Sequence, residues 1–283
     1  MTADELGTGA WWSQGRLLRG LAAAGELVLP ARCAACHGVG APLCRACTAG
    51  LRTASHDGGP ALVRLRSPPP GMPPCWSAAR FEGALRFAVT AYKDEDRRDL
   101  RPALARLLAT ALATAVATDP GVRRRAVLGE RVAVVPLPTA RSSRRRRGDD
   151  PVADLARDAV SLALGAGPVR TGPVRTGPVR IGPVRIGPVR AGPVGALVVL
   201  PALSHTRVVA DQAHLNRQAR AANLAGAMTL LPAWRDAVRG AACVLVDDVV
   251  TTGSTLAEAA RALRSAGAEQ VVAATVAATT RRW

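Results

Sequence analysis

The chain has 283 residues, of which 48% are hydrophobic and 21% are charged, a composition typical of a globular protein that buries a core without disulfides. No run of about 18 apolar, uncharged residues occurs, so we expect no transmembrane helix. The net charge is +17, and 38 residues are Lys or Arg. This charge favours an anionic partner such as phosphate or nucleic acid, although Arg used as a general solubilising residue explains it equally well.

The N-terminal residues lack the features of a secretory signal, because Asp4 and Glu5 lie where such signals carry positive charge. A reducing, cytoplasmic compartment is therefore expected, in which disulfides are rare. Residues 11–29 are compatible with a short amphipathic helix, and Pro30 would end it ahead of a group of cysteines.

Two Cys-x-x-Cys pairs follow, Cys33 with Cys36 and Cys44 with Cys47. Each pair places two thiolates close enough to share a metal, and two pairs complete a closed tetrahedral zinc site. A closed site leaves no position for a substrate, so the pattern predicts a structural zinc that supplies the folding energy of a small module. Two alternatives are a redox dithiol and a c-type haem, whose attachment string the residues from Cys33 to His37 match.

Composition divides the chain into three parts. Residues 1–52 are expected to form the N-terminal helix and a zinc-ribbon-like module, and residues 53–75, rich in Ser, Gly and Pro, a linker. Residues 76–283 are expected to form the larger domain. Within it, residues 167–195 repeat the pentapeptide GPVR-x, whose period fits neither helix nor strand, so we expect a disordered basic surface loop. A phosphate-binding arm for nucleic acid is the alternative interpretation.

After the linker, strand and helix patterns alternate along the chain. Strands are expected at residues 76–81, 132–136, 196–200, 243–247 and 270–276. Helices are expected at residues 83–92, 100–116, 151–164, 212–228 and 255–266. The alternation predicts an α/β fold with a mostly parallel sheet flanked by helices.

The most informative segment runs from Val244 to Leu256 and combines an apolar strand, two carboxylates, a small polar loop and a helix start. Ligands of open α/β sheets bind beyond the carboxyl ends of the strands, and a loop of this kind at a helix N-terminus favours phosphate. Gly253 permits a positive φ or a close approach to the ligand. Thr255 and Glu258 have the spacing of a capping box, which predicts that the helix begins near Thr255.

Asp247 and Asp248 stand at the end of the expected strand, beside this loop. Carboxylates accept hydrogen bonds from vicinal hydroxyls such as those of a ribose, and they stabilise a developing cation. The alternative is a simple preference of Asp for the positive end of a helix dipole, which does not account for the whole string.

The string resembles the signature of the type I phosphoribosyltransferases, which bind phosphoribosyl pyrophosphate together with magnesium. The resemblance implies that Asp247 and Asp248 contact the ribose hydroxyls and serve catalysis. It also implies that the following loop holds the 5′-phosphate. The residues of that loop are Val250, Thr251, Thr252, Gly253, Ser254 and Thr255.

A four-cysteine module ahead of such a domain is similar to the ComF/GntX group of phosphoribosyltransferase-like proteins. Further matching pieces are Tyr92-Lys93, Val135-Pro136-Leu137-Pro138, Asp211-Gln212 and Arg220-x-x-Asn223. The group usually carries an Arg-Gly-aromatic-Asn-Gln stretch after the Val-Pro loop. This chain has Arg147-Gly148-Asp149-Asp150 there, so the aromatic and amide groups are missing.

Arg141 and Arg144–Arg147 follow the Val-Pro loop. In type I phosphoribosyltransferases the corresponding loop faces pyrophosphate, and guanidinium groups suit phosphate oxygens. We therefore expect Arg141 and Arg144 to bind the substrate. A contact with a DNA or RNA backbone is equally consistent, and it would be nonspecific because no nucleic-acid recognition motif is evident. Asp150 is placed to cap a helix beginning at Pro151.

Two functional hypotheses follow. The first is an enzyme that displaces pyrophosphate from phosphoribosyl pyrophosphate and transfers the phosphoribosyl group to an acceptor that the sequence does not identify. The second is a protein that keeps the fold without turnover. For it, the ComF resemblance implies handling of incoming single-stranded DNA in natural competence, with DNA or the competence machinery as partner. A nucleotide-sensing regulator is a third interpretation.

Overall fold

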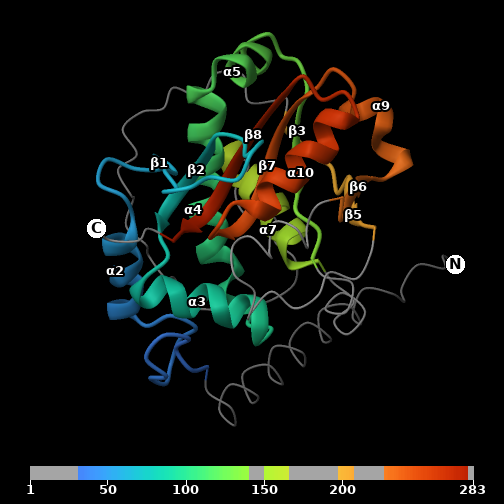
Figure 1. Ribbon diagram of the computed structural model, residues 1–283. Coiled ribbons are helices and arrows are strands. Elements are labelled where there is room, and N and C mark those ends of the chain that lie inside the picture. Colours follow the sequence, from blue (N-terminus) through green and yellow to red (C-terminus); the bar gives the residue numbers. More distant parts are fainter. Residues whose placement is uncertain (1–30, 140–149, 166–196, 207–225, 280–283) are drawn as a thin grey trace, which may run out of the picture.

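The computed structural model describes residues 31–139, 150–165, 197–206 and 226–279 (Figure 1). Its centre is a sheet of six strands, five of which run parallel, and the edge strand β1 pairs antiparallel with β2. In spatial order the strands are β1 (Ala61–Leu62), β2 (Cys75–Arg80), β8 (Gln270–Ala278), β7 (Ala242–Val250), β3 (Val132–Pro136) and β4 (Leu197–Val199). This sheet, with helices on both faces, confirms the predicted fold class.

The helices form a layer on each face of the sheet (Figure 1). One layer contains α3 (Gly83–Asp94), the short η1 (Arg98–Leu100), α4 (Arg101–Thr118), α5 (Pro120–Val127) and α7 (Pro151–Ala163). The other contains α10 (Ser254–Ser265), and beside it lie η2 (Pro232–Trp234), α9 (Arg235–Val238) and a separate antiparallel pair, β5 (Leu203–His205) and β6 (Met228–Leu230).

Residues of the central strands alternate between these two layers. In β7, Val244 and Val246 belong to the core beneath α4, whereas Cys243 and Leu245 belong to the core beneath α10. All four side chains are fully buried. Parallel strands that are covered on both faces read as continuous apolar runs, which is why these strands could be recognised from the sequence.

Helix α4 is a core helix. Residues Arg98–Thr118 are, by length and composition, apolar enough to cross a membrane, but such a helix alone is weak evidence for a span. Leu104, Leu108 and Leu112 recur at helical spacing and are fully buried against the sheet. Its apolar composition is therefore explained by packing inside this protein.

The Pro-rich segment 53–75 lies against the sheet and α10. Val63 N–H donates to the carbonyl oxygen of Cys75 at 2.7 Å, which extends the pairing of β1 with β2. Arg264 Nη1, on α10, donates to the carbonyl oxygen of Gly71 at 2.6 Å. Met72 packs against the core beneath α10. These contacts tie the segment to the larger domain, and the proposed domain boundary stays a prediction.

The structure differs from the expected elements in several places. Met228 begins strand β6, where the sequence predicts the end of a helix; the rest of that helix, at 212–225, lies outside the described residues. The expected helix at 11–29 and the GPVR repeat at 167–195 also lie outside them. Asp150 does cap α7, accepting a hydrogen bond from Ala153 N–H at 3.3 Å. Elements that the sequence did not predict are α2 (Arg45–Ala54), α5, α9, β1 and β5.

Candidate functional site

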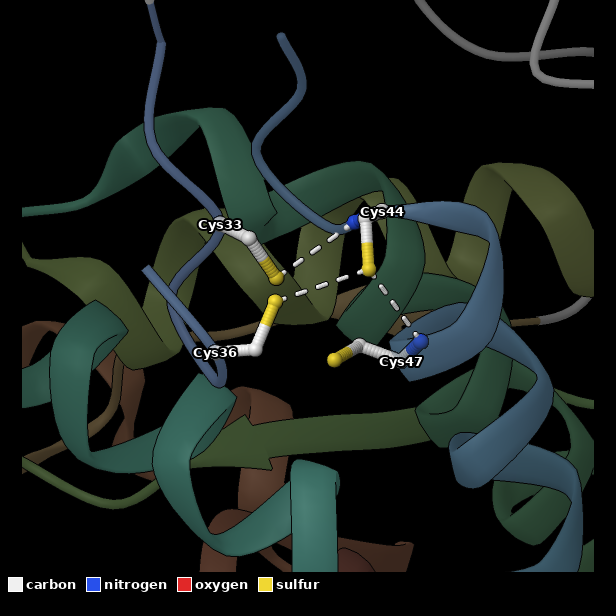
Figure 2. A group of neighbouring side chains, drawn as sticks. All are labelled: Cys33, Cys36, Cys44 and Cys47. Atoms are coloured by element: carbon white, nitrogen blue, oxygen red, sulfur yellow. Dashed lines mark hydrogen bonds between the residues drawn. The ribbon is translucent and has the colours of Figure 1, made fainter. Parts of the chain in front are cut away.

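Four cysteine thiols converge at the start of α2 (Figure 2). The sulfur atoms of Cys33, Cys36, Cys44 and Cys47 all lie within 4.8 Å of one another. The sulfurs of Cys36 and Cys44 are 3.7 Å apart. A disulfide bond is only about 2.05 Å long, whereas four sulfurs at ~2.3 Å from a tetrahedral zinc lie ~3.8 Å apart. The donor set and its spacing therefore fit a zinc site.

Backbone hydrogen bonds shape this cluster. Cys33 N–H donates to the carbonyl oxygen of Gly38 at 2.8 Å, and His37 N–H donates to that of Cys33 at 2.9 Å, which closes a tight turn. Cys44 N–H donates to Cys33 Sγ at 3.4 Å, and Cys47 N–H donates to Cys44 Sγ at 3.5 Å (Figure 2). N–H donors directed at sulfur stabilise the thiolate, which is the form that binds a metal.

The four thiols differ in how readily they ionise. Burial opposes ionisation of Cys33, but backbone hydrogen bonds, chiefly from Cys44, outweigh it and lower the pKa of Cys33 to about 6. Burial and the neighbouring thiols raise the pKa of Cys47 well above its ordinary value. Negative charge on one sulfur thus opposes charge on the next, and a bound cation is what would allow all four to ionise together.

The acidic pair divides between the two faces of the sheet. Asp247 is half-buried and lines a small cavity on the α10 side, together with Leu256. Asp248 is 3% exposed, and its Oδ2 lies 3.5 Å from Nζ of Lys93 on α3. Asp247 Oδ1 accepts a hydrogen bond from the backbone N–H of Asp248 at 2.9 Å. Asp248 Oδ1 accepts one from the backbone N–H of Val249 at 2.7 Å. The two acids therefore have different environments.

Burial raises the pKa of Asp247 to about 8, the neighbouring Asp248 adds to this effect, and Lys93 partly offsets it. Asp248 also raises the pKa of Lys93 above its ordinary value. This environment therefore favours the protonated form of Asp247 and the charged form of Lys93.

The loop between β7 and α10 requires glycine at position 253. Gly253 has φ +78° and is the residue from which α10 begins. A Cβ atom here would collide with Met72 Sδ and lie 3.1 Å from Leu65 Cδ1. The positive φ disfavours a side chain here, as the sequence predicts, and an added Cβ would also force the Met72 side chain to move.

Four of the six loop residues predicted to hold phosphate line the cavity beside Asp247. These are Val250, Thr251, Gly253 and Thr255. The other two contact each other, with Thr252 Oγ1 donating to Ser254 Oγ at 3.1 Å. Because α10 begins at Ser254, the N–H groups of its first turn have no acceptor within the helix. The cavity measures about 20 Å³, room for roughly one water molecule.

The predicted capping box between Thr255 and Glu258 is wrong. Helix α10 has Gly253 at its N-cap, without a side-chain cap. Glu258 is 6% exposed and reaches β6 instead, where its Oε1 accepts from Met228 N–H at 3.0 Å. Arg261 Nη2 donates to that same Oε1 at 2.7 Å and to the carbonyl oxygen of Met228 at 2.9 Å. The pair therefore fixes both backbone groups of Met228.

Arg141 and Arg144 lie outside the described residues, so their predicted role stays a prediction. The residues on either side of this loop are placed. Thr139 Oγ1 donates to Asp150 Oδ1 at 3.0 Å. The loop follows β3, which runs parallel to β7 and next to it, so it starts at the same edge of the sheet as Asp247.

The sequence indicates Lys93 only as part of the Tyr92-Lys93 match to the ComF/GntX group and predicts no role for it at the site. Its partner, Asp248, lies far away in the sequence, so no local motif connects the two. One signal was present, because Lys93 is the one lysine in a chain whose other basic residues are arginines.

Comparison with known proteins agrees with this geometry. Residues 206–283 match the family model described as phosphoribosyl transferase domain. The matched segment contains β7, the loop and α10, and therefore both acids. A search of curated proteins found no match. The fold and the family match together define an α/β protein with a mostly parallel sheet and a phosphoribosyltransferase domain, preceded by a four-cysteine cluster that is compatible with a small zinc module.

Proposed function

We propose that the protein binds phosphoribosyl pyrophosphate at the carboxyl ends of β3 and β7 and transfers its phosphoribosyl group to an acceptor. The observation that carries the proposal is that the segment matching the phosphoribosyltransferase family surrounds one cavity with an acid, a glycine loop and a helix N-terminus. First-turn N–H groups and the helix dipole favour the 5′-phosphate. Asp247 lies beside them, where a ribose hydroxyl would follow.

The proposed reaction breaks the bond between ribose C1 and pyrophosphate and forms a bond from C1 to the nucleophile. Pyrophosphate leaves with the bonding electrons, so positive charge develops on the ribose. The acidic residues Asp247 and Asp248 would stabilise that charge. Arg141 and Arg144 would hold the leaving pyrophosphate, since their loop starts at the same edge. Magnesium would accompany the pyrophosphate, bound largely through substrate and water.

The small volume of the cavity has a consequence for binding. Room for roughly one water is too little for a phosphate group. The loop of residues 251–253 must therefore move outward as the ligand enters. Thr251 at the start of this loop is exposed, whereas Gly253 at its end is buried against Met72, so the movement would also displace the Met72 side chain.

Calorimetry with phosphoribosyl pyrophosphate and Mg²⁺ tests the proposal. We expect the wild-type protein to bind and Asp247→Ala to lose at least tenfold in affinity. Asp236→Ala, at an exposed acid on α9, is the matched control and should bind like wild type. Absence of binding by wild type, or equal binding by Asp247→Ala, would overturn the proposal.

For the four-cysteine cluster we propose one structural zinc, held by Cys33, Cys36, Cys44 and Cys47. The closed set of four sulfurs supports a structural role. The cluster also stands next to the core, because Leu51 and Ala54 of α2 are buried with Leu85 of α3. The resemblance to the ComF/GntX group, which rests partly on this module, remains part of the proposal.

A second candidate function is a ComF-type role in handling single-stranded DNA without turnover, also in the cytoplasm. The net charge of +17 favours it. A gel shift with single-stranded DNA across a salt series separates the two functions. Binding that falls steeply with salt and survives Asp247→Ala supports the DNA role. No shift at low salt removes it.

A further inference from the structure

Helices α3 and α10 approach the end of β7 from opposite faces, and each lies beside one of its two acids. Asp247 shares its cavity with residues of α10. Asp248 faces Lys93 of α3, with 3.5 Å between Oδ2 and Nζ. The side chain of Asp248 is 4% exposed and that of Lys93 is 59% exposed. A buried carboxylate is thus compensated by a cation whose outer side faces solvent.

The position of Lys93 is fixed by the contacts of Tyr92, the preceding residue on α3. Tyr92 is buried, and its hydroxyl donates to the carbonyl oxygen of Pro151 at 2.8 Å. Arg98 Nη1 donates to the carbonyl oxygen of Tyr92 at 2.7 Å. Lys93 also lies in the last turn of α3, where the negative end of the helix dipole stabilises a cation. Helix α3 therefore places the ammonium group of Lys93 beside the carboxyl end of β7.

Two adjacent carboxylates are an unfavourable surface for a polyanionic ligand, because like charges repel strongly where water is partly excluded. An ammonium beside one of them removes much of this repulsion. The alternation of side chains along β7 directs Asp248 away from the cavity, into a buried position where a carboxylate without a partner is costly. Lys93 meets both requirements.

We propose that Lys93 is a positioning residue of the ligand site: it neutralises Asp248 on the α3 side of β7, so that Asp247 alone presents an uncompensated carboxyl group to a polyanionic sugar phosphate. The identity of the ligand rests on the proposed function. The ion pair itself can be tested without any ligand.

The single lysine makes that test direct. In protein grown with lysine carrying ¹³C at Cε, the one lysine side chain gives one resonance, whose shift follows its titration. Asp248, Asp247 and Asp94 are the acids that stabilise its charge, in that order. We expect the pKa of Lys93 to lie above its ordinary value in wild type and to fall clearly in Asp248→Asn. Asp94→Asn is the control and should lower it less.

Calorimetry with phosphoribosyl pyrophosphate and Mg²⁺ tests the role toward the ligand. Lys93→Met is expected to weaken binding at least tenfold, and Lys93→Arg to restore most of the affinity.

The pH dependence of binding gives a second test. If a ribose hydroxyl pairs with ionised Asp247, the affinity of wild type rises as that group loses its proton. Because Lys93 favours this ionisation, the midpoint should move to higher pH in Lys93→Met and return in Lys93→Arg. A purely structural role would leave that midpoint unchanged.

The outcomes separate the two proposals. A lysine resonance that titrates identically in wild type and Asp248→Asn overturns the inference about Lys93 alone. Equal affinity and an unchanged pH midpoint in Lys93→Met do the same. Failure of wild type to bind phosphoribosyl pyrophosphate overturns the proposed function, and with it the ligand role of Lys93, whatever the lysine titration shows.

Discussion

The sulfur atom of Met72 occupies the space that a side chain at Gly253 would need. These two residues belong to parts of the chain that the sequence alone keeps separate, a Pro-rich segment and the loop ahead of α10. Leu65 lies against the same point, and Arg264 holds the carbonyl oxygen of Gly71. The shape of the proposed phosphate loop is therefore set from the N-terminal side of the domain.

Replacing Gly253 with alanine should destabilise the protein in two ways. The positive φ costs about 1–2 kcal/mol for a residue with Cβ, and the collision adds a smaller cost, because the end of the flexible Met72 side chain can move aside. Urea unfolding measures the sum. Gly129→Ala is the matched control, because Gly129 has φ +72° and nothing within 4 Å of the added Cβ.

The double variant Gly253→Ala with Met72→Ala isolates the steric part. We expect Gly253→Ala to lower the free energy of unfolding by less in the Met72→Ala background than in wild type, because the collision with Met72 is absent there. Equal losses in both backgrounds would show that Met72 does not restrict this loop.

The raised pKa of Asp247 predicts a specific dependence of stability on pH. Between the ordinary value of 3.8 and about 8, the folded state binds more protons at this site than the unfolded state. The free energy of unfolding therefore falls as pH rises through that window. Asp247→Asn removes the titration, so its stability relative to wild type should increase as pH rises through this window.

Urea unfolding at a series of pH values from about 4 to about 9 measures this difference. Asp236→Asn, at an exposed acid, should show no such trend relative to wild type. A constant difference between Asp247→Asn and wild type across the series would contradict the assigned environment of Asp247.

Glu258 should contribute to stability through Met228. Glu258→Ala leaves the N–H of Met228 without its acceptor, which costs about 1–3 kcal/mol. Although burial opposes ionisation, the hydrogen bonds from Arg261 and Met228 lower the pKa of Glu258 below its ordinary value. Its contribution is thus present above pH 4.5 and is lost as pH falls through the lowered pKa.

The comparison for Glu258 is Glu130, which is 45% exposed and pairs with Arg125. Glu130→Ala should cost no more than about 1 kcal/mol, because solvent screens a surface pair. A similar small cost for Glu258→Ala would mean that the contact with β6 adds little.

The cysteine cluster predicts the metal content of the protein. Elemental analysis should find about one zinc per chain, and Cys36→Ser should lose it and lower the melting temperature. Cys243→Ala replaces a fully buried thiol far from the cluster and should keep the metal. A well-folded wild-type protein without metal would contradict the assignment.

The sequence predicted those features that depend on local spacing. The central strands are apolar throughout because helices cover both faces, so β3, β7 and β8 stood out. The two Cys-x-x-Cys pairs are close in the chain, and short turns bring them together. Asp150 ahead of Pro151 is likewise a local signal for the start of a helix.

Features that depend on tertiary partners could not be predicted. Thr255 and Glu258 have the spacing of a capping box, but the carboxylate of Glu258 accepts hydrogen bonds from Met228 and Arg261 instead. The contact of Lys93 with Asp248 joins α3 to the end of β7, two elements that lie far apart in the sequence. The two-residue strand β1 is too short for a periodic pattern and exists because β2 offers an edge.

The contribution of residues 31–75 to the larger domain bears on how the protein can be dissected. A polypeptide starting at residue 76 would lose β1 and the hydrogen bond from Val63, so β2 would become a bare outer strand. It would also lose α2, whose Leu51 and Ala54 cover Leu85 on α3. An unpaired strand edge next to a leucine that has become exposed to solvent promotes self-association. Truncation before residue 76 should therefore give aggregates rather than a soluble fragment.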